Sequence, residues 1–187
     1  MRTFVAIDIS DAARQAVAEM VSQLHAMGNS VRWVRPESLH LTLKFLGEVP
    51  EERAPELIRA LEESISGIGP FEYRLTGKGC FPNCRRPRVL WVGVENPGRE
   101  IFHLQERVED AFGKIGFSRE RRPFTAHLTV GRVKRPGGLE ELVRAFRDYT
   151  LEPLSVFVGE VRLMRSTLKP GGAVYSVISA AKLAGNG

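Results

Sequence analysis

Two stretches of this chain alternate apolar and polar residues in the same way, one at residues 39–46 and one at residues 124–133. Successive side chains of a β-strand point to opposite faces, so each stretch predicts a strand with one aliphatic face and one polar face. In the first stretch the predicted buried row is Leu41, Leu43 and Phe45, and the polar row is His40, Thr42 and Lys44. In the second stretch the buried row is Phe124, Ala126, Leu128 and Val130, and the polar row is Thr125, His127 and Thr129.

The rest of the chain divides into strand-like and helix-like segments. Apolar, β-rich runs predict strands at residues 2–8, 31–34, 71–76, 89–94, 154–168 and 173–183. Apolar positions at helical spacing predict a helix capped by Ser10 or Asp11 and ended by Gly28. Three more helices are predicted at residues 51–65, 101–112 and 139–146. The Gly- and Pro-containing segments 79–84 and 169–172 predict turns or irregular loops.

The order of these elements repeats along the chain. In each half a helix precedes the His-containing strand and another helix follows it, which suggests an internal duplication. We therefore predict an α+β fold with two pseudo-symmetric lobes of mostly antiparallel sheet, helices on the outer faces, and a central groove. Residues 1–187 are the right size for a single domain of this kind.

The polar rows contain the same sequence motif, His-x-Thr, at His40–Thr42 and at His127–Thr129, and the two histidines are 87 positions apart. A chain with 4 His and its few Thr residues is expected to contain only about 0.15 such triplets by chance. The alternative interpretation, two half-buried strands with ordinary polar sides, fits one copy better than two. We therefore predict that both His-x-Thr motifs face the groove and form one active site.

Two histidines and two threonines have a defined chemistry. Histidine gives or takes a proton near neutral pH, so two of them can act as acid and base on one substrate. A threonine hydroxyl can hydrogen-bond a phosphate oxygen. Cleavage of a phosphodiester at a cyclic phosphate matches this set of groups. Metal catalysis fits less well, because the motif strands provide no third ligand of the kind that a catalytic zinc site needs.

Charge, cysteines and the remaining histidines indicate less about function than the two motifs do. The net charge of +5 suits a polyanionic partner, and Arg119–Glu120–Arg121–Arg122 and Arg132–Val133–Lys134–Arg135 flank the second motif. The only cysteines, Cys80 and Cys84, do not suggest a disulfide framework or a zinc site. His25 and His103 are expected to be surface or structural residues. No apolar run is long enough for a membrane span and no signal-peptide pattern is present, so we expect a cytoplasmic protein.

The chain resembles the two-histidine (2H) phosphoesterase superfamily, in its RNA 2',3'-cyclic phosphodiesterase (2'-5' RNA ligase) branch. The resemblance rests above all on the segment His40–Leu41–Thr42–Leu43–Lys44–Phe45–Leu46–Gly47 and on its counterpart from Phe124 to Arg132. It implies metal-independent hydrolysis of RNA terminal 2',3'-cyclic phosphates to 2'-phosphates, with no cofactor. It also implies that His40 is the proton donor, that His127 is the proton acceptor, and that Thr42 and Thr129 hold the phosphate. The implied partners are RNA 3'-ends or nucleotides with a 2',3'-cyclic phosphate, bound by a monomer that is not membrane-associated.

Two positions depart from what the resemblance or the alternation implies. Ala126 stands where the family often has proline. Arg132 falls on the buried face by strict alternation, but a bulge at Gly131 would turn it toward the phosphate, so it is a further candidate for phosphate binding. Two other functions remain open: a 2'-5' RNA ligase that runs the reaction in reverse, and a non-catalytic module that binds RNA ends.

Overall fold

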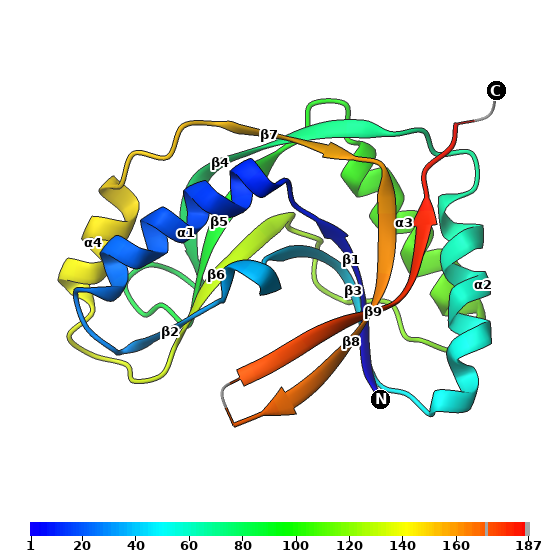
Figure 1. The fold of residues 1–187 in the computed structure, drawn as a ribbon, viewed down its shortest axis with the longest axis horizontal. Coiled ribbons are helices and arrows are strands. Elements are labelled where there is room, and N and C mark those ends of the chain that lie inside the picture. The colour runs from blue at the N-terminus through cyan, green and yellow to red at the C-terminus, as the bar shows by residue number, and fades with distance from the viewer. Residues whose placement is uncertain (171, 186–187) are drawn as a thin grey trace.

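Two antiparallel sheets form the framework of the protein in a computed structural model that describes residues 1–170 and 172–185 (Figure 1). Sheet A has the strand order β3-β1-β8-β9, and sheet B has the order β2-β6-β5-β4-β7. The strands of sheet A are β1 (Arg2–Asp8), β3 (His40–Glu48), β8 (Glu160–Lys169) and β9 (Gly172–Lys182). Those of sheet B are β2 (Val31–Trp33), β4 (Phe71–Phe81), β5 (Val89–Glu95), β6 (His127–Val133) and β7 (Leu154–Val158).

Four α-helices cover the outer faces of these sheets. Helices α2 (Ala54–Ile65) and α3 (Glu100–Lys114) pack against each other and against sheet A. Helices α1 (Asp11–His25) and α4 (Glu140–Asp148) lie together against sheet B, at the opposite end of the molecule (Figure 1). The Ser10 side chain caps α1 by accepting a hydrogen bond from the Ala13 amide at 3.2 Å, as the sequence predicts. The predicted α+β fold with two lobes and outer helices is confirmed.

The lobes are not the two halves of the sequence. The N-terminal half supplies β1, β3 and α2 to the sheet A lobe, but it also supplies α1, β2, β4 and β5 to the sheet B lobe. The chain passes between the sheets directly from β2 through the 3₁₀ turn η1 (Pro36–Ser38) into β3. The Val34 amide, in this connection, still donates to the Val130 carbonyl at 2.9 Å. This connection brings β3 alongside β6, and with them the two motifs.

Several predicted boundaries are wrong. The run 154–168 is not one strand, because it divides at Gly159 into β7 of sheet B and β8 of sheet A. Strand β4 continues through Gly79 to Phe81, where a loop was predicted. Strand β6 begins at His127, so Phe124 to Ala126 precede it. The predicted turn at 169–172 joins β8 to β9, although Gly171 lies outside the described residues.

The expectation for the cysteines is also corrected. Cys80 and Cys84 form a disulfide that closes a short loop at the end of β4. A separation of four residues gave no sign of this from the sequence alone. Among the described helices, none has both the length and the apolar character required to cross a membrane.

Candidate active site

Each motif strand contains a β-bulge at the residue that follows the motif threonine. In β3, Thr42 pairs with Ala6 and Lys44 pairs with Val5, so Leu43 is the extra residue. In β6, Thr129 pairs with Trp91 and Gly131 pairs with Leu90, so Val130 is the extra residue. A bulge places two residues opposite one and reverses the facing of the residues beyond it. The two halves of the site therefore share a β-bulge as well as a sequence motif.

The bulges correct the predicted rows beyond each threonine. Lys44 was expected on the polar face and Phe45 in the core, but Lys44 is 5% exposed and Phe45 is 66% exposed. The Lys44 ammonium donates to the Glu109 carboxylate of α3 at 2.6 Å, a buried ion pair that replaces the lost solvation. In β6 the same reversal turns Arg132 to the face that carries His127 and Thr129, as predicted, although the extra residue is Val130 and not Gly131.

Both motif histidines are held in the same way. The Nδ1 atom of His40 lies 2.7 Å from the Ser38 carbonyl oxygen, and Nδ1 of His127 lies 2.6 Å from the Thr125 carbonyl oxygen. A carbonyl only accepts, so Nδ1 carries the proton in each ring. The Nε2 atom of each histidine is then the position at which a proton can be taken up or given to a substrate.

Aromatic rings fix the orientation of both imidazoles. The His40 ring is stacked on Phe4 at 4.8 Å and meets Tyr175 of β9 edge-on at 5.0 Å between centroids. The His127 ring meets Phe81 edge-on at 5.0 Å and lies 6.4 Å from Trp91. Each histidine is thus bounded by two aromatic side chains, which come from strands far from it in the sequence.

The motif threonines have hydroxyl groups available for a ligand. Thr42 and Thr129 are half-buried on the same faces as their histidines. Within the described residues neither hydroxyl makes a hydrogen bond, and neither does the exposed Arg132 guanidinium. These groups can donate to the oxygens of an anion without first breaking an internal contact.

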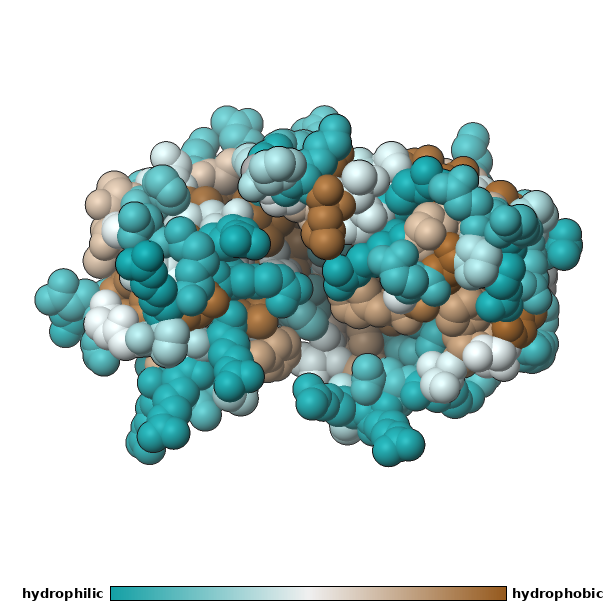
Figure 2. All heavy atoms as spheres, turned by 90° about the horizontal axis from the view of Figure 1, so that it is seen from below, coloured by the Kyte–Doolittle hydropathy of each residue, from teal (hydrophilic) through white to brown (hydrophobic). Residues whose placement is uncertain are grey.

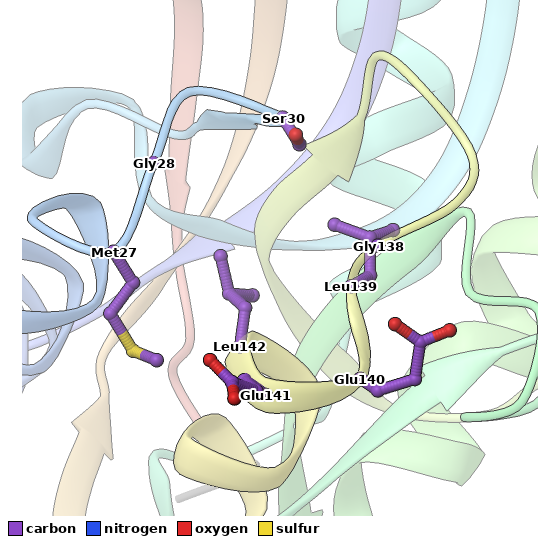
Figure 3. A pocket seen from close by; sticks show the side chains of 8 residues that line it. All are labelled: Met27, Gly28, Ser30, Gly138, Leu139, Glu140, Glu141 and Leu142. Carbon is purple, nitrogen blue, oxygen red and sulfur yellow. The ribbon is translucent and has the colours of Figure 1, made fainter.

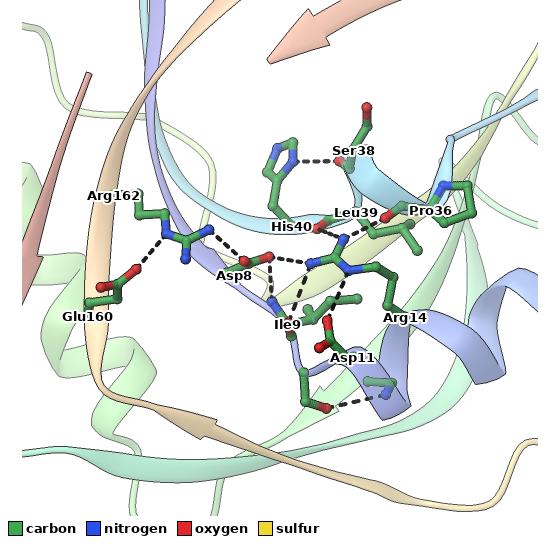
Figure 4. A network of polar contacts seen from close by, with 12 residues as sticks. Asp8, Ile9, Asp11, Arg14, Pro36, Ser38, Leu39, His40, Glu160 and Arg162 are labelled. Carbon is green, nitrogen blue, oxygen red and sulfur yellow. Dashed lines mark hydrogen bonds and ion pairs between the residues drawn. The ribbon is translucent and has the colours of Figure 1, made fainter. Parts of the chain in front are cut away.

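A charged network adjoins His40 (Figure 4). Among the described residues no carboxylate contributes to the pKa of His127. Asp8 pairs with His40 across β1 and β3. Its carboxylate binds Arg14 at 2.6 Å and also binds Arg162 of β8. Arg14 in turn donates to the carbonyl oxygens of Pro36 and Leu39, which border the turn that carries Ser38. The network therefore fixes the backbone that holds His40.

Electrostatics distinguishes the two histidines. Burial lowers the pKa of His40 below its usual value, while the Ser38 carbonyl and the Asp8 carboxylate act in the opposite direction. Burial also lowers the pKa of His127, which has the Thr125 carbonyl but no carboxylate to oppose it. The Arg132 guanidinium contributes to the lowered pKa of both histidines, so it lies within electrostatic reach of each. The Asp8 carboxylate acts to raise the pKa of His40 and the Arg14 guanidinium acts to lower it, and neither of these charges acts on His127.

The structure thus brings together all of the predicted site residues: His40, Thr42, His127, Thr129 and Arg132. The molecule is hollowed between the two lobes on the face seen in Figure 2, with hydrophilic side chains around the hollow.

A cavity of about 350 Å³ lies elsewhere, between the end of α1 and the start of α4, and contains no motif residue (Figure 3). His25 and His103 are exposed on α1 and α3. Among the described residues there is no cluster of three or more His, Cys, Asp or Glu side chains arranged to hold a metal ion.

Sequence reasoning missed the groups that surround the motifs. These groups are Asp8 and Arg14 beside His40, the aromatic residues next to each histidine, and the exposed Phe45. Only the exposure of Phe45 could have been predicted from the sequence. A bulge expected after the threonine of one motif implies a bulge at the same place in the other motif. The others reach the site through strand pairing between distant segments.

Comparison with known protein families matches both halves of the chain. The family described as LigT like Phosphoesterase matches residues 7–91 and again residues 92–175, and each match contains one motif. The chain is 39% identical to an RNA 2',3'-cyclic phosphodiesterase of Methanothermobacter thermautotrophicus, over 94% of this chain and 95% of the relative. It is 40% identical to one of Archaeoglobus fulgidus, over 94% of this chain and 96% of the relative.

Solved structures agree with these relatives. A crystal structure of a Thermus thermophilus protein superposes with a TM-score of 0.81 and 30% identity, covering 100% of both chains. The structure of E. coli LigT complexed with 3'-AMP superposes with a TM-score of 0.73 and 25% identity, covering 97% of both chains. The similarity therefore extends over both lobes and both motifs.

Proposed function

Because the chain belongs to the LigT-like family of two-histidine phosphoesterases, we propose that it hydrolyses 2',3'-cyclic phosphates at RNA ends to 2'-phosphates. The observation that carries this proposal is the equivalence of the two motifs in space. Each histidine donates Nδ1–H to a carbonyl two residues before it, beside an unengaged threonine hydroxyl. The curated relatives named RNA 2',3'-cyclic phosphodiesterase give the class of substrate.

The mechanism follows from where protons are needed. Water attacks the phosphorus, the P–O3' bond breaks, and the product keeps a 2'-phosphate. His127 accepts the proton of the attacking water, and His40 donates a proton to the departing O3'. Burial favours the neutral form of both histidines, and the Asp8 carboxylate acts in the opposite direction on His40 alone. This difference supports the assignment of acid and base that the family resemblance implies.

The negative charge of the phosphate is met by side chains from both lobes. Thr42 and Thr129 donate to the non-bridging oxygens, and Arg132 adds a charged donor from the β6 side. The proposal needs both lobes in one unit, consistent with the predicted single domain of residues 1–187. Phe45 offers an exposed ring on the His40 face of sheet A, on which the terminal base can stack.

Turnover of a defined substrate tests the proposal. A short oligoribonucleotide ending in a 2',3'-cyclic phosphate is incubated with the protein in excess EDTA between pH 5 and pH 9. We expect a 2'-phosphate product, a bell-shaped pH profile, and a loss of about 10²- to 10⁴-fold in kcat for His40→Ala and for His127→Ala.

His103→Ala is the matched control, because His103 is exposed on α3 outside both motifs. Full activity in either motif variant would refute the assignment of acid and base. Inhibition by EDTA would show that a metal takes part. Binding of the oligonucleotide without turnover would identify a non-catalytic module.

A further inference from the structure

Three internal segments of the chain are together rich in Lys and Arg and contain no acidic residue. Residues 20–36, 73–94 and 121–139 hold 12 of the 27 Lys and Arg residues and none of the 22 Asp and Glu residues. Acidic residues flank these segments on either side, so the separation of charge is local. Such an imbalance produces a strongly positive surface only if the fold brings the segments together.

The fold brings parts of these segments together at one end of sheet B, while Arg74 pairs with Glu95 at the other end. The strands β2, β6, β5 and β4 are neighbours, and Arg32, Arg132, Val89 and Phe81 form one row across them. The Val133 amide donates to the Arg88 carbonyl at 2.9 Å, which places Arg88 beside the end of β6. Four neighbouring strands span about 15 Å. The row therefore runs from Arg32 through Arg132, at the site, to the loop after β4.

The charges in this row are not neutralised within the protein. Arg32 and Arg132 are direct cross-strand partners, an arrangement of like charges that destabilises a sheet. Within the described residues neither forms an ion pair, and neither do Arg85, Arg86 and Arg88, all of which are exposed. Elsewhere in the molecule several arginines, among them Arg14, Arg53 and Arg162, are paired with carboxylates.

The loop that carries Arg85 and Arg86 is well ordered by its own contacts. The Cys80–Cys84 disulfide closes it, and the Asn83 side-chain oxygen accepts hydrogen bonds from the Arg85 and Arg86 amides at 3.0 Å. The Arg88 amide donates to the Phe81 carbonyl at 2.7 Å. Because Phe81 also contacts the His127 ring, the loop adjoins the site directly. The arginines are thus presented on a preorganised backbone, which lowers the entropic cost of binding.

We propose that Arg32, Arg85, Arg86 and Arg88 form an arginine track that binds the phosphodiester backbone of RNA next to its cyclic-phosphate end. This inference rests on the proposed function and identifies its substrate as a polynucleotide rather than a free nucleotide. Cations that lie on both sides of Arg132 and the motif residues match a strand whose terminal phosphate lies at the motifs and whose other phosphates lie along the same end of sheet B. Single strands bind proteins through such charged surfaces together with stacked bases.

Salt-dependent binding is the direct test. The affinity of a fluorescently labelled, single-stranded RNA decamer with a 3'-terminal phosphate is measured by anisotropy between 50 and 200 mM salt. For a single strand each phosphate contact contributes about 0.7 to the slope of log K against log salt concentration. We expect the double variant Arg85→Gln/Arg86→Gln to bind more weakly and to lower this slope by about 1.4.

The matched control removes the same charge from the other side of sheet B. Arg144→Gln/Arg147→Gln changes two exposed arginines of α4, and we expect it to leave affinity and slope unchanged. Thermal unfolding of both double variants checks that each remains folded. An unchanged slope in Arg85→Gln/Arg86→Gln, or an equal decrease in the α4 variant, would overturn the proposal.

Steady-state kinetics distinguishes the contribution of the arginine track to RNA binding from that of the motif residues to catalysis. The kcat/KM values are compared for uridine 2',3'-cyclic monophosphate and for the decamer ending in the same cyclic phosphate. We expect Arg85→Gln/Arg86→Gln to reduce the value for the decamer more than that for the mononucleotide. Equal losses would contradict the track. If the unmodified protein turned over neither substrate, the proposed function would fail, while the salt slope would still decide whether the track binds RNA.

A different anionic partner gives a distinct result. Vesicles containing phosphatidylserine present a negatively charged surface but no strand that can enter the site. If Arg85→Gln/Arg86→Gln abolished vesicle binding and left binding of the decamer unchanged, the surface would be a membrane contact, and the proposal of an RNA track would be wrong.

Discussion

Phe45 and Arg132 occupy equivalent positions in the two halves of the site. Each lies five residues after its motif histidine, and each is turned to the histidine's face by a bulge after the motif threonine. One half therefore presents an exposed aromatic ring where the other presents a guanidinium. The duplicated framework supports two different tasks, stacking on the sheet A side and anion binding on the sheet B side.

Replacing the ring tests the first task. We expect Phe45→Ala to lower kcat/KM for a cyclic-phosphate substrate by roughly 5- to 150-fold, because stacking of a base on an aromatic side chain is worth about 1–3 kcal/mol. The loss should lie mainly in KM, since Phe45 does not transfer a proton. Phe45 is 66% exposed, so thermal unfolding should change little. Phe157→Ala, which removes a similarly exposed ring from β7, is the control, and an equal loss there would contradict the assignment.

Replacing the guanidinium tests the second task. Arg132 helps to lower the pKa of both His40 and His127, so its removal raises both pKa values. We expect both limbs of the pH profile of kcat/KM to move to higher pH in Arg132→Gln, together with a higher KM for the phosphate. Arg132→Lys keeps the charge and should restore the position of the limbs. A profile that stays in place in Arg132→Gln would show that Arg132 does not act on the histidines.

The buried ion pair beneath the first motif makes a prediction about stability. Lys44 and Glu109 have side chains that are 3% and 6% exposed, and they join β3 to α3. Removing one partner leaves a buried charge without compensation, which costs about 3–5 kcal/mol. We expect Lys44→Met to lower the free energy of unfolding by about this amount in urea titrations.

The double variant identifies the cause. Lys44→Met/Glu109→Leu removes both charges and should be considerably more stable than Lys44→Met alone. If the two destabilisations simply added, packing rather than the unpaired charge would explain the loss. Arg74→Met is a comparison at an exposed ion pair with Glu95, where only a small change is expected.

The sequence was sufficient to predict the two motif strands, their aliphatic rows as far as the threonines, and the α+β architecture with helices on the outside. Those predictions rest on local periodicity, which survives in the folded chain as buried Leu41, Leu128 and Val130. The orientation of Lys44 and Phe45 could not be predicted by alternation, because a single extra residue in the ladder reverses every side chain beyond it.

Other parts of the site depend on pairings between distant segments. Asp8 lies beside His40, and Tyr175 reaches the same ring, because β1, β8 and β9 join β3 in one sheet. Nothing in the segment between Asp8 and His40 indicates that register. The division of residues 154–168 between two sheets is likewise a property of the whole fold, since both pieces have the same apolar pattern.

The carboxylate of Asp8 allows the roles of the two histidines to be tested separately. Asp8 acts to raise the pKa of His40, while Arg14 and Arg132 act to lower it, and Asp8 does not contribute to the pKa of His127. In Asp8→Asn the pKa of His40 therefore falls and that of His127 stays. If His40 is the acid, it must be protonated to act, so the alkaline limb of the kcat/KM profile should move to lower pH while the acid limb remains. Glu160→Gln is the matched control, because it removes the other carboxylate bound to Arg162 and leaves Asp8 in place.

Two outcomes of the Asp8→Asn experiment would contradict this assignment. Movement of the acid limb alone would mean that His40 is the base and His127 the acid. An unchanged profile would show that Asp8 only orders the backbone around Ser38.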